Sequence, residues 1–143
     1  MRLEVNQFVL IGVLVSMSSA AAAESWLCVT DSSTGFHYNN ASQSWERQNF
    51  KADEKYLLRP SKSENVLWEL VEVGEDYPFV ECRTDFAKTD ANLECADLVS
   101  FRFNRSSLKF VISATYGYFA KTREFPDLKP DSVFVAIGRC SEI

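Results

Sequence analysis

The chain has one histidine, few glycines and no cluster of basic residues, and each shortage removes a class of function. Because His37 is the only histidine, a Ser-His-Asp triad would have to use it, yet the chain has no G-x-S-x-G nucleophile elbow. On a strand, His37 would point away from its neighbours Phe36 and Tyr38, toward solvent. These absences favour a non-enzymatic protein, and we expect no catalytic residue.

Metal-binding patterns are missing as well. The four cysteines include no C-x-x-C pair, and a single histidine adds little to them. The interval from Asp85 to Asp90 lacks the alternating oxygen ligands and the glycine of a calcium loop. We therefore expect no metal ligand and no cofactor.

Acidic side chains leave one enzymatic alternative open. A glycosidase needs two carboxyl groups about 5 to 10 Å apart across a cleft, and sequence spacing cannot show that separation. The candidate carboxylates are Glu69, Glu72, Glu75, Asp76, Glu81, Asp85, Asp90, Glu94 and Asp97. Since scattered acids normally form a solvated face, a small envelope hydrolase is an alternative and not the expectation.

Charge and hydropathy exclude two kinds of partner. The formal net charge is −5 and the sequence pI is near 4.9, so nucleic acid and anionic membrane surfaces are not expected to bind. The apolar run at residues 8–15 is far shorter than the ~20 residues that a membrane-spanning helix requires. We expect no membrane span.

Residues 1–23 have the pattern of a cleavable export signal. Arg2 provides a weakly cationic start, the apolar run follows, and Ala21-Ala22-Ala23 supplies an A-x-A type cleavage site. The residues before Cys28 do not form a lipoprotein signal, so no lipid anchor is expected. We predict a periplasmic or secreted protein in which residues 24–143 form one domain.

The four cysteines, placed in an oxidising compartment, predict two disulfides. Three pairings are possible. Cys82 and Cys95 flank a turn-like segment at 87–90 and would face each other if that turn joined two paired strands. Cys28 and Cys140 lie near the two ends of the domain, so their bond would join the first strand to the last. We predict Cys28–Cys140 and Cys82–Cys95.

Short apolar runs with a period of two residues, interrupted by turn residues, predict an antiparallel all-β domain. The clearest strand is 108–118, and pairing Phe103 with Leu108 also places Phe101 opposite Phe110 on one apolar face. The other predicted strands are 26–30, 36–38, 44–50, 56–59, 66–73, 79–83, 93–98 and 133–140. A small up-and-down β-barrel is the favoured architecture, because it brings the first and last strands together; a β-sandwich is the alternative.

Three groups of residues carry a resemblance to known proteins. They are Trp26-Leu27-Cys28, then Thr34-Gly35-Phe36-His37-Tyr38 with Trp45 and Phe50, and the end Gly138-Arg139-Cys140-Ser141-Glu142-Ile143. This constellation resembles a group of small, uncharacterised exported bacterial proteins over most of residues 24–143. It implies a periplasmic or secreted setting and transfers no catalytic residue. In architecture alone, the chain is similar to lipocalin-like β-barrels and periplasmic lysozyme inhibitors, a likeness that carries no function.

Aromatic residues indicate a binding rim at the end of the longest predicted strand. Tyr116 and Tyr118 end that strand and lead into the connection 120–131, which Phe119 and Phe125 bracket. A barrel mouth edged by aromatic rings and a long loop is a common place for ligands or protein partners. Core filling explains aromatic side chains as well, so both interpretations stay open.

The sequence therefore favours an exported binding module that holds a small ligand or an envelope protein at the barrel mouth. The alternatives are the carboxylate hydrolase and a structural or stress-protective envelope protein without a discrete site. The sequence leaves the identity of the partner and the oligomeric state open.

Overall fold

The computed structural model describes residues 24–119 and 132–143, so the expected signal at 1–23 and the connection 120–131 lie outside the described residues. The strands are β1 (Trp26–Asn39), β2 (Ser44–Phe50), β3 (Lys55–Pro60), β4 (Trp68–Glu72), β5 (Pro78–Cys82), β6 (Asn92–Ala96), β7 (Val99–Asn104), β8 (Lys109–Ala114) and β9 (Val133–Glu142), with one four-residue helix, α1 (Tyr116–Phe119). No helix of these two ranges is long and apolar enough to cross a membrane.

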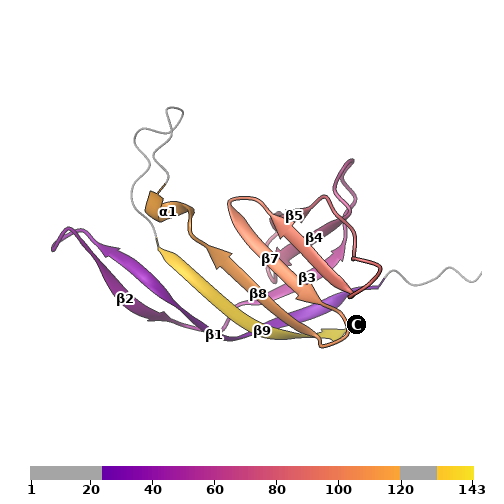
Figure 1. The fold of residues 1–143 in the computed structure, drawn as a ribbon, viewed down its shortest axis with the longest axis horizontal. Coiled ribbons are helices and arrows are strands. Elements are labelled where there is room, and N and C mark those ends of the chain that lie inside the picture. Colours follow the sequence, from indigo (N-terminus) through magenta and orange to yellow (C-terminus); the bar gives the residue numbers. More distant parts are fainter. Residues whose placement is uncertain (1–23, 120–131) are drawn as a thin grey trace, which may run out of the picture.

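The strands form one antiparallel sheet that is nearly closed into a barrel (Figure 1). The strand order is β5-β4-β3-β1-β9-β8-β7-β6, with β2 paired to β1 outside this path. Apart from β2, neighbours in the sheet are neighbours in the chain, and the first and last strands, β1 and β9, pair in the middle of the path. The predicted up-and-down β-barrel is confirmed.

Both predicted disulfides are present. Cys28 and Cys140 are direct cross-strand partners in the β1–β9 pair, as expected for strands that close a barrel. Cys82 and Cys95 are also bonded, but the hairpin argument for them is wrong. β5 and β6 are the two ends of the sheet path and not a paired hairpin, and the disulfide joins them across this seam. Paired disulfides of this kind are typical of an oxidising, extracytoplasmic compartment.

Aromatic and aliphatic side chains fill the barrel. Alternation places Phe101 and Phe103 of β7 inside and Arg102 outside, and both phenylalanines are at most 1% exposed. Leu58, Leu70, Leu93 and Ile112 from four other strands are fully buried beside them. The interior is therefore a packed core, as in other small barrels.

The hairpin of β7 and β8 has a different register from the predicted one. Phe103 pairs with Phe110, two residues beyond the expected Leu108, which instead lies in the turn with a φ of 57°. Asn104 accounts for the longer turn, because its side-chain oxygen accepts hydrogen bonds from the backbone of Ser106 and Ser107 at 3.0 and 2.8 Å. A shift of two residues preserves the buried face, so the apolar pattern alone could not detect it.

The predicted strand 108–118 also ends early. β8 stops at Ala114, and Tyr116 and Tyr118 lie in α1 instead of on the strand. The two tyrosines alternate as strand residues would, but beyond Ala114 the chain no longer follows β9. Their position on a short helix turns them toward a different surface, described below.

β1 is one strand of 14 residues, where two short strands were predicted. Pairing with β9 carries it through the turn-like residues 31–35, with a bulge between Thr30 and Ser32. Before the bulge Trp26, Cys28 and Thr30 face the core, and after it Ser33 does. The distal part of β1 (33–39) continues beyond β3 and pairs with β2 and with the start of β9. We call β2, residues 33–39 and residues 133–136 the arm (Figure 1).

The loop between β5 and β6 closes one end of the barrel. Phe86 in this loop is buried, with ring centroids 5.5 Å from Trp26 and 5.1 Å from Trp68. Asp85 holds the loop in place: its Oδ1 accepts hydrogen bonds from Trp68 Nε1 at 2.9 Å and from the Phe86 backbone N at 2.8 Å. The bond from Trp68 is the larger cause, and the backbone bond the second, of the lowered pKa of Asp85.

Asp85→Ala is therefore expected to destabilise the protein by about 1 kcal/mol near neutral pH. A lowered pKa in the folded state means that the contribution is present above the unfolded-state pKa of about 3.9 and is lost as pH falls through the folded value. Thermal melts of wild type and variant should differ at pH 7, and the difference should narrow as the pH is lowered below the unfolded-state pKa. Asp97→Ala is the control, because Asp97 is exposed and makes no side-chain hydrogen bond within 24–119 and 132–143; an equal loss in that variant would contradict the assignment to Asp85.

Candidate functional site

An apolar groove of about 450 Å³ lies on the arm beside α1. Its lining comes from five segments of the chain: Phe36 of β1, Trp45 of β2, Thr115 between β8 and α1, Tyr118 and Phe119 of α1, and Val133 of β9. None of these six residues is charged, and five of them are apolar or aromatic. The groove can therefore accept an apolar group.

Strand register explains why these side chains share one face. Phe36 is the cross-strand partner of Val133, and Tyr38 is the partner of Trp45. Paired residues lie on the same face of a sheet, and Val133 is in phase with Val135, which is 44% exposed on the outside of β9. The groove therefore belongs to the outer surface and not to the barrel interior.

Gly35 allows the strands beneath the groove to approach closely. A Cβ atom at this position would contact the backbone carbonyl oxygen of Val133. The absence of a side chain lets β1 and β9 stay paired here, so that Phe36 and Val133 lie next to each other.

Edge-to-face ring contacts attach α1 to the arm. The Trp45 ring lies 5.5 Å from Tyr38 and 5.3 Å from Tyr118, centroid to centroid, and Tyr116 lies 6.0 Å from Phe119. Such pairs are favourable because ring edges are positive and ring faces negative. Trp45 is thus the contact that connects the helix to the β1–β2 hairpin.

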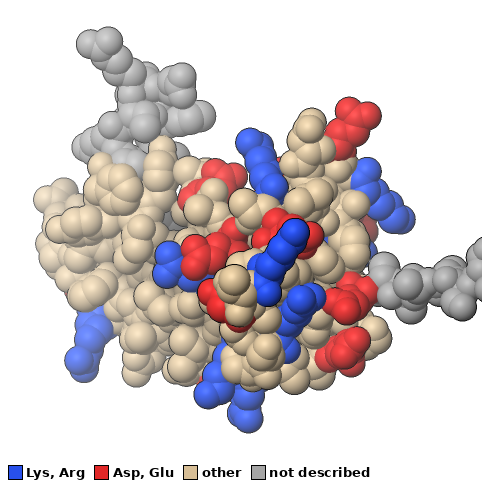
Figure 2. Space-filling model, turned by 45° about the vertical axis from the view of Figure 1, so that its right-hand side comes forward, with Lys and Arg blue, Asp and Glu red and all other residues tan. Residues whose placement is uncertain are grey.

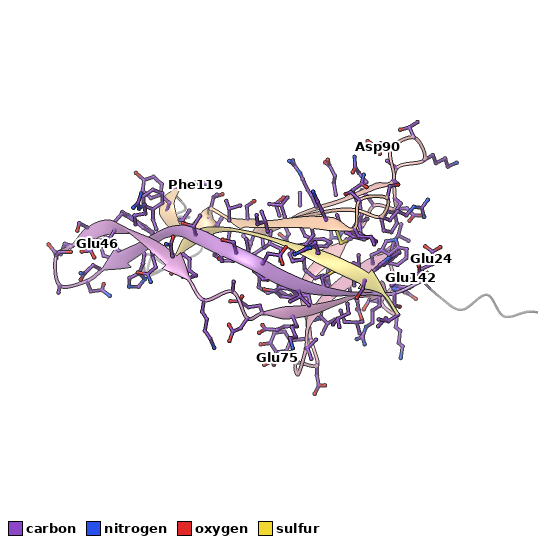
Figure 3. The ribbon with its side chains drawn as sticks, turned by 90° about the horizontal axis from the view of Figure 1, so that it is seen from below. Glu24, Glu46, Glu75, Asp90, Phe119 and Glu142 are labelled. Carbon is purple, nitrogen blue, oxygen red and sulfur yellow. A yellow bond between two sulfur atoms is a disulfide. The ribbon has the colours of Figure 1, made fainter. Side chains whose placement is uncertain are left out.

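The rings around the groove are nevertheless open to solvent. Phe36 is 50% exposed, Tyr118 67% and Phe119 71%. Figure 3 shows Phe119 raised from the arm, at the opposite end of the molecule from Glu24 and Glu142. Contiguous exposed aromatic side chains are uncommon on proteins that bind nothing, and they mark interaction sites.

The charged residues lie mainly elsewhere. In Figure 2 charged side chains of both signs crowd the barrel, whereas the part of this face that carries the arm is almost free of them. On this face the charged side chains are thus concentrated on the barrel and are few on the arm.

The structure brings together two of the four residues predicted as a binding rim. Tyr118 and Phe119 line the groove, the Tyr116 ring contacts that of Phe119 edge to face, and Phe125 lies outside the described residues. Sequence reasoning missed Phe36 and Trp45, although both stood in the motif that carried the family resemblance. The available signal was a pair of short aromatic-rich segments, around Phe36 and Trp45, separated by a polar turn, which is typical of a hairpin with one aromatic face.

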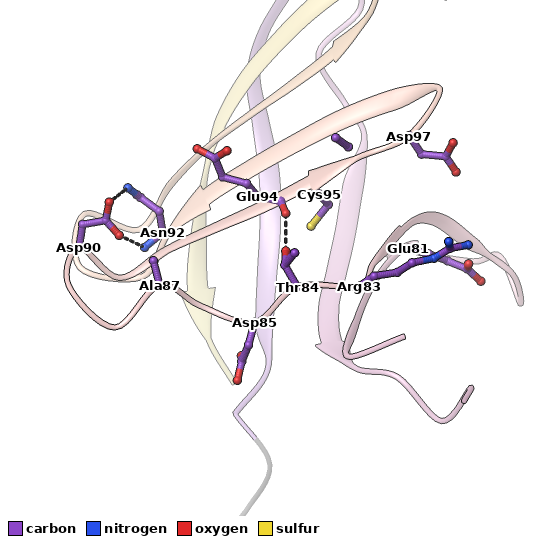
Figure 4. A pocket seen from close by; sticks show the side chains of 11 residues that line it. Glu81, Arg83, Thr84, Asp85, Ala87, Asp90, Asn92, Glu94, Cys95 and Asp97 are labelled. Carbon is purple, nitrogen blue, oxygen red and sulfur yellow. Dashed lines mark hydrogen bonds between the residues drawn. The ribbon is translucent and has the colours of Figure 1, made fainter. Parts of the chain in front are cut away.

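A second hollow, of about 520 Å³, lies outside the barrel at the seam between β5 and β6 (Figure 4). Its lining includes five acidic residues, Glu81, Asp85, Asp90, Glu94 and Asp97, and one basic residue, Arg83. The labelled carboxylates of Asp85, Asp90 and Asp97 point in different directions, and that of Asp90 is bonded to Asn92. A general acid would need a raised pKa, whereas the pKa of Asp85 is lowered. The three aspartates therefore do not point toward a common place in this hollow.

The remaining predicted candidates have structural partners or lie apart. Glu69 accepts a hydrogen bond from Arg59 Nε at 2.6 Å, and His37 is exposed with its Nδ1 3.4 Å from the Ser132 hydroxyl. Within the described ranges, no three His, Cys, Asp or Glu side chains are grouped so that they could hold a metal ion.

The chain matches no protein-family model, no curated protein and no solved structure. Its function has to be inferred from its own residues and their geometry.

Proposed function

We propose that this protein is an exported, non-enzymatic binding module, and that it binds a protein partner by accepting an apolar side chain of that partner in the groove of the arm. The observation that carries the proposal is the exposed aromatic lining of the groove, above all Phe36, Tyr118 and Phe119. Burying these rings against a partner would remove a large apolar area from water, which is the main driving force of association.

The packed barrel supports a protein partner over an enclosed small ligand. Barrels that carry small molecules hold them in a hollow interior, but here Phe101 and Phe103 occupy the core. A small-molecule site usually surrounds most of its ligand, whereas Phe36, Tyr118 and Phe119 of this groove are half or more exposed. An open, aromatic surface suits the anchor residue of a larger partner.

Site-specific photo-crosslinking tests this proposal. A photoreactive phenylalanine analogue at position 36 or 119 is expected to crosslink one protein of constant mass in cells that export this chain. The matched control is position 77, because Tyr77 is also an exposed aromatic residue, at 66%, and lies in the β4–β5 connection on the barrel. Identical products from all three positions, or no protein adduct at 36 and 119, would contradict the proposal; a small-molecule adduct would indicate a ligand-binding protein instead.

A further inference from the structure

β2 has an unpaired edge in the described part of the chain. Its seven residues pair with β1 alone, whereas β5 and β6, the ends of the barrel path, are joined across the seam by Cys82–Cys95. β2 contains no proline and no lysine, which are residues that commonly protect such an edge. Another extended chain can pair with an edge of this kind.

Hydrogen bonds show which backbone groups face outward. The Gln48 carbonyl oxygen accepts a bond from Thr34 Oγ1 of β1 at 3.3 Å, so this carbonyl faces β1. Backbone groups alternate between the two edges of a strand, and those of Trp45, Arg47 and Asn49 therefore face away from β1. The Asn49 carbonyl already accepts a bond from Gln48 Nε2 at 3.0 Å. The backbone groups of Trp45 and Arg47 remain open to a new strand.

The side chains of the same two residues lie on the outer face, next to the groove. Trp45 lines the groove, and Arg47 is the cross-strand partner of Phe36, which also lines it. Arg47 is exposed and has no ion pair or hydrogen bond among residues 24–119 and 132–143. By contrast, Glu46 on the opposite face accepts hydrogen bonds from Asn39 Nδ2 at 2.9 Å and Ser42 Oγ at 3.0 Å.

We infer that β2 accepts an extended segment of the partner protein as an added antiparallel strand, and that this segment has the pattern acidic-x-apolar. Running antiparallel to β2, the segment places its acidic residue opposite Arg47 and, two residues later, its apolar residue opposite Trp45 at the margin of the groove. The inference rests on the proposed function, because the apolar residue is the anchor that the groove receives.

A second copy of this chain fits the edge less well. If two copies of the chain paired their β2 strands antiparallel to each other, all seven residues could pair in only one register. That register is centred on Arg47, the middle residue of the strand. That register places Arg47 opposite Arg47, and like charges directly opposite each other are destabilising. The free arginine instead complements an acidic side chain.

NMR titration of the isotope-labelled protein with a seven-residue peptide, acetyl-TTETFTT-amide, tests the inference. We expect amide shifts at Trp45 and Arg47 and a shift of the Trp45 indole. N-methylation of the peptide's glutamate and phenylalanine removes the N–H groups that would bond to β2 and should weaken binding about tenfold or more. N-methylation of the threonine between them is the matched control, because its N–H points away from β2 and its loss should change little.

A charge exchange tests the role of Arg47. Arg47→Glu should weaken binding of the TTETFTT peptide about tenfold. The same variant should bind a peptide that carries lysine in place of glutamate about as well as the wild-type protein binds TTETFTT. Lys109→Glu on the exposed surface of β8 is the control variant, and its affinity for both peptides should match wild type. The isomer TTFTETT, in which the two side chains are exchanged, should bind weakly.

The outcomes separate this inference from the proposed function. Strand addition at β2 would be overturned by any of three results: equal losses from all N-methylated peptides, no rescue by the lysine peptide, or no binding of any peptide. Crosslinking at positions 36 and 119 would still support a partner in the groove. Shifts at Trp45 and Arg47 that depend on the concentration of the protein itself would assign the edge to self-association and overturn the inference.

Discussion

Replacing both Cys28 and Cys140 with alanine is expected to lower the free energy of unfolding by about 4 to 5 kcal/mol. This value is the loop-closure entropy that a link across 112 residues removes from the unfolded chain. The bond connects the first and last strands of the barrel, so its removal frees almost the whole domain in the unfolded state. Alanine is the appropriate replacement because both positions are at least 95% buried, where a serine hydroxyl would need a partner. Urea unfolding followed by tryptophan fluorescence measures the loss.

The double replacement of Cys82 and Cys95 is the matched comparison. This bond spans 13 residues, and its loss should cost about 3 kcal/mol. It should have a second effect that the first variant lacks, because no continuous ladder joins β5 to β6: amide hydrogen exchange should accelerate along both strands at the seam. A larger loss of stability from Cys82 and Cys95 than from Cys28 and Cys140 would contradict the loop-length argument.

Phe103→Ala is expected to destabilise the domain by about 3 to 5 kcal/mol, since truncation leaves a cavity in a packed core. Phe103 is 1% exposed, and its ring lies 5.3 Å from Trp26, 6.0 Å from Phe86 and 6.5 Å from Phe101. The same substitution at Phe119, which is 71% exposed, should change stability by no more than about 0.5 kcal/mol. Thermal and urea unfolding of the two variants give the comparison.

The pair of variants also separates core from binding site. If Phe119 serves a partner, Phe119→Ala should retain a wild-type melting temperature and lose the crosslink formed from position 36. A loss of several kcal/mol on Phe119→Ala would instead make it part of the folded core, and the groove would lose its main evidence as a docking site.

The barrel and the arm have different roles in this scheme. The barrel is packed, disulfide-linked and charged on its surface, and it carries the arm through the continuous pair β1 and β9. A rigid scaffold that positions a small apolar surface reduces the ordering that binding requires, which favours affinity. The edge of β2 and the aromatic rings lie next to each other on the arm, so one extended segment can meet both.

Local patterns in the sequence were sufficient for the fold class and most strands. Both disulfides were predicted correctly, but Cys82–Cys95 was predicted from a hairpin that the structure does not contain. Alternation such as Phe101-Arg102-Phe103 depends only on the period of a strand, and Ser44–Phe50 was predicted with the bounds that the structure has. Cys28 and Cys140 near the two ends of the domain indicated closure of first against last strand. These features depend on residues close in sequence, or on a single long-range bond.

Tertiary pairing decided the rest. β1 continues through its turn-like middle because β9 supplies a hydrogen-bonding partner along its length, and the β7–β8 register depends on a turn whose alternatives preserve the same buried face. The groove combines side chains of β1, β2, β9 and α1, and only the folded sheet places them together. Tyr118 and Phe119 could be selected from sequence as neighbours of a predicted strand end. For Phe36 and Trp45 the sequence indicated only a hairpin with one aromatic face, and the bulge after Thr30, which the sequence did not show, contributes to deciding which side of the sheet that face occupies.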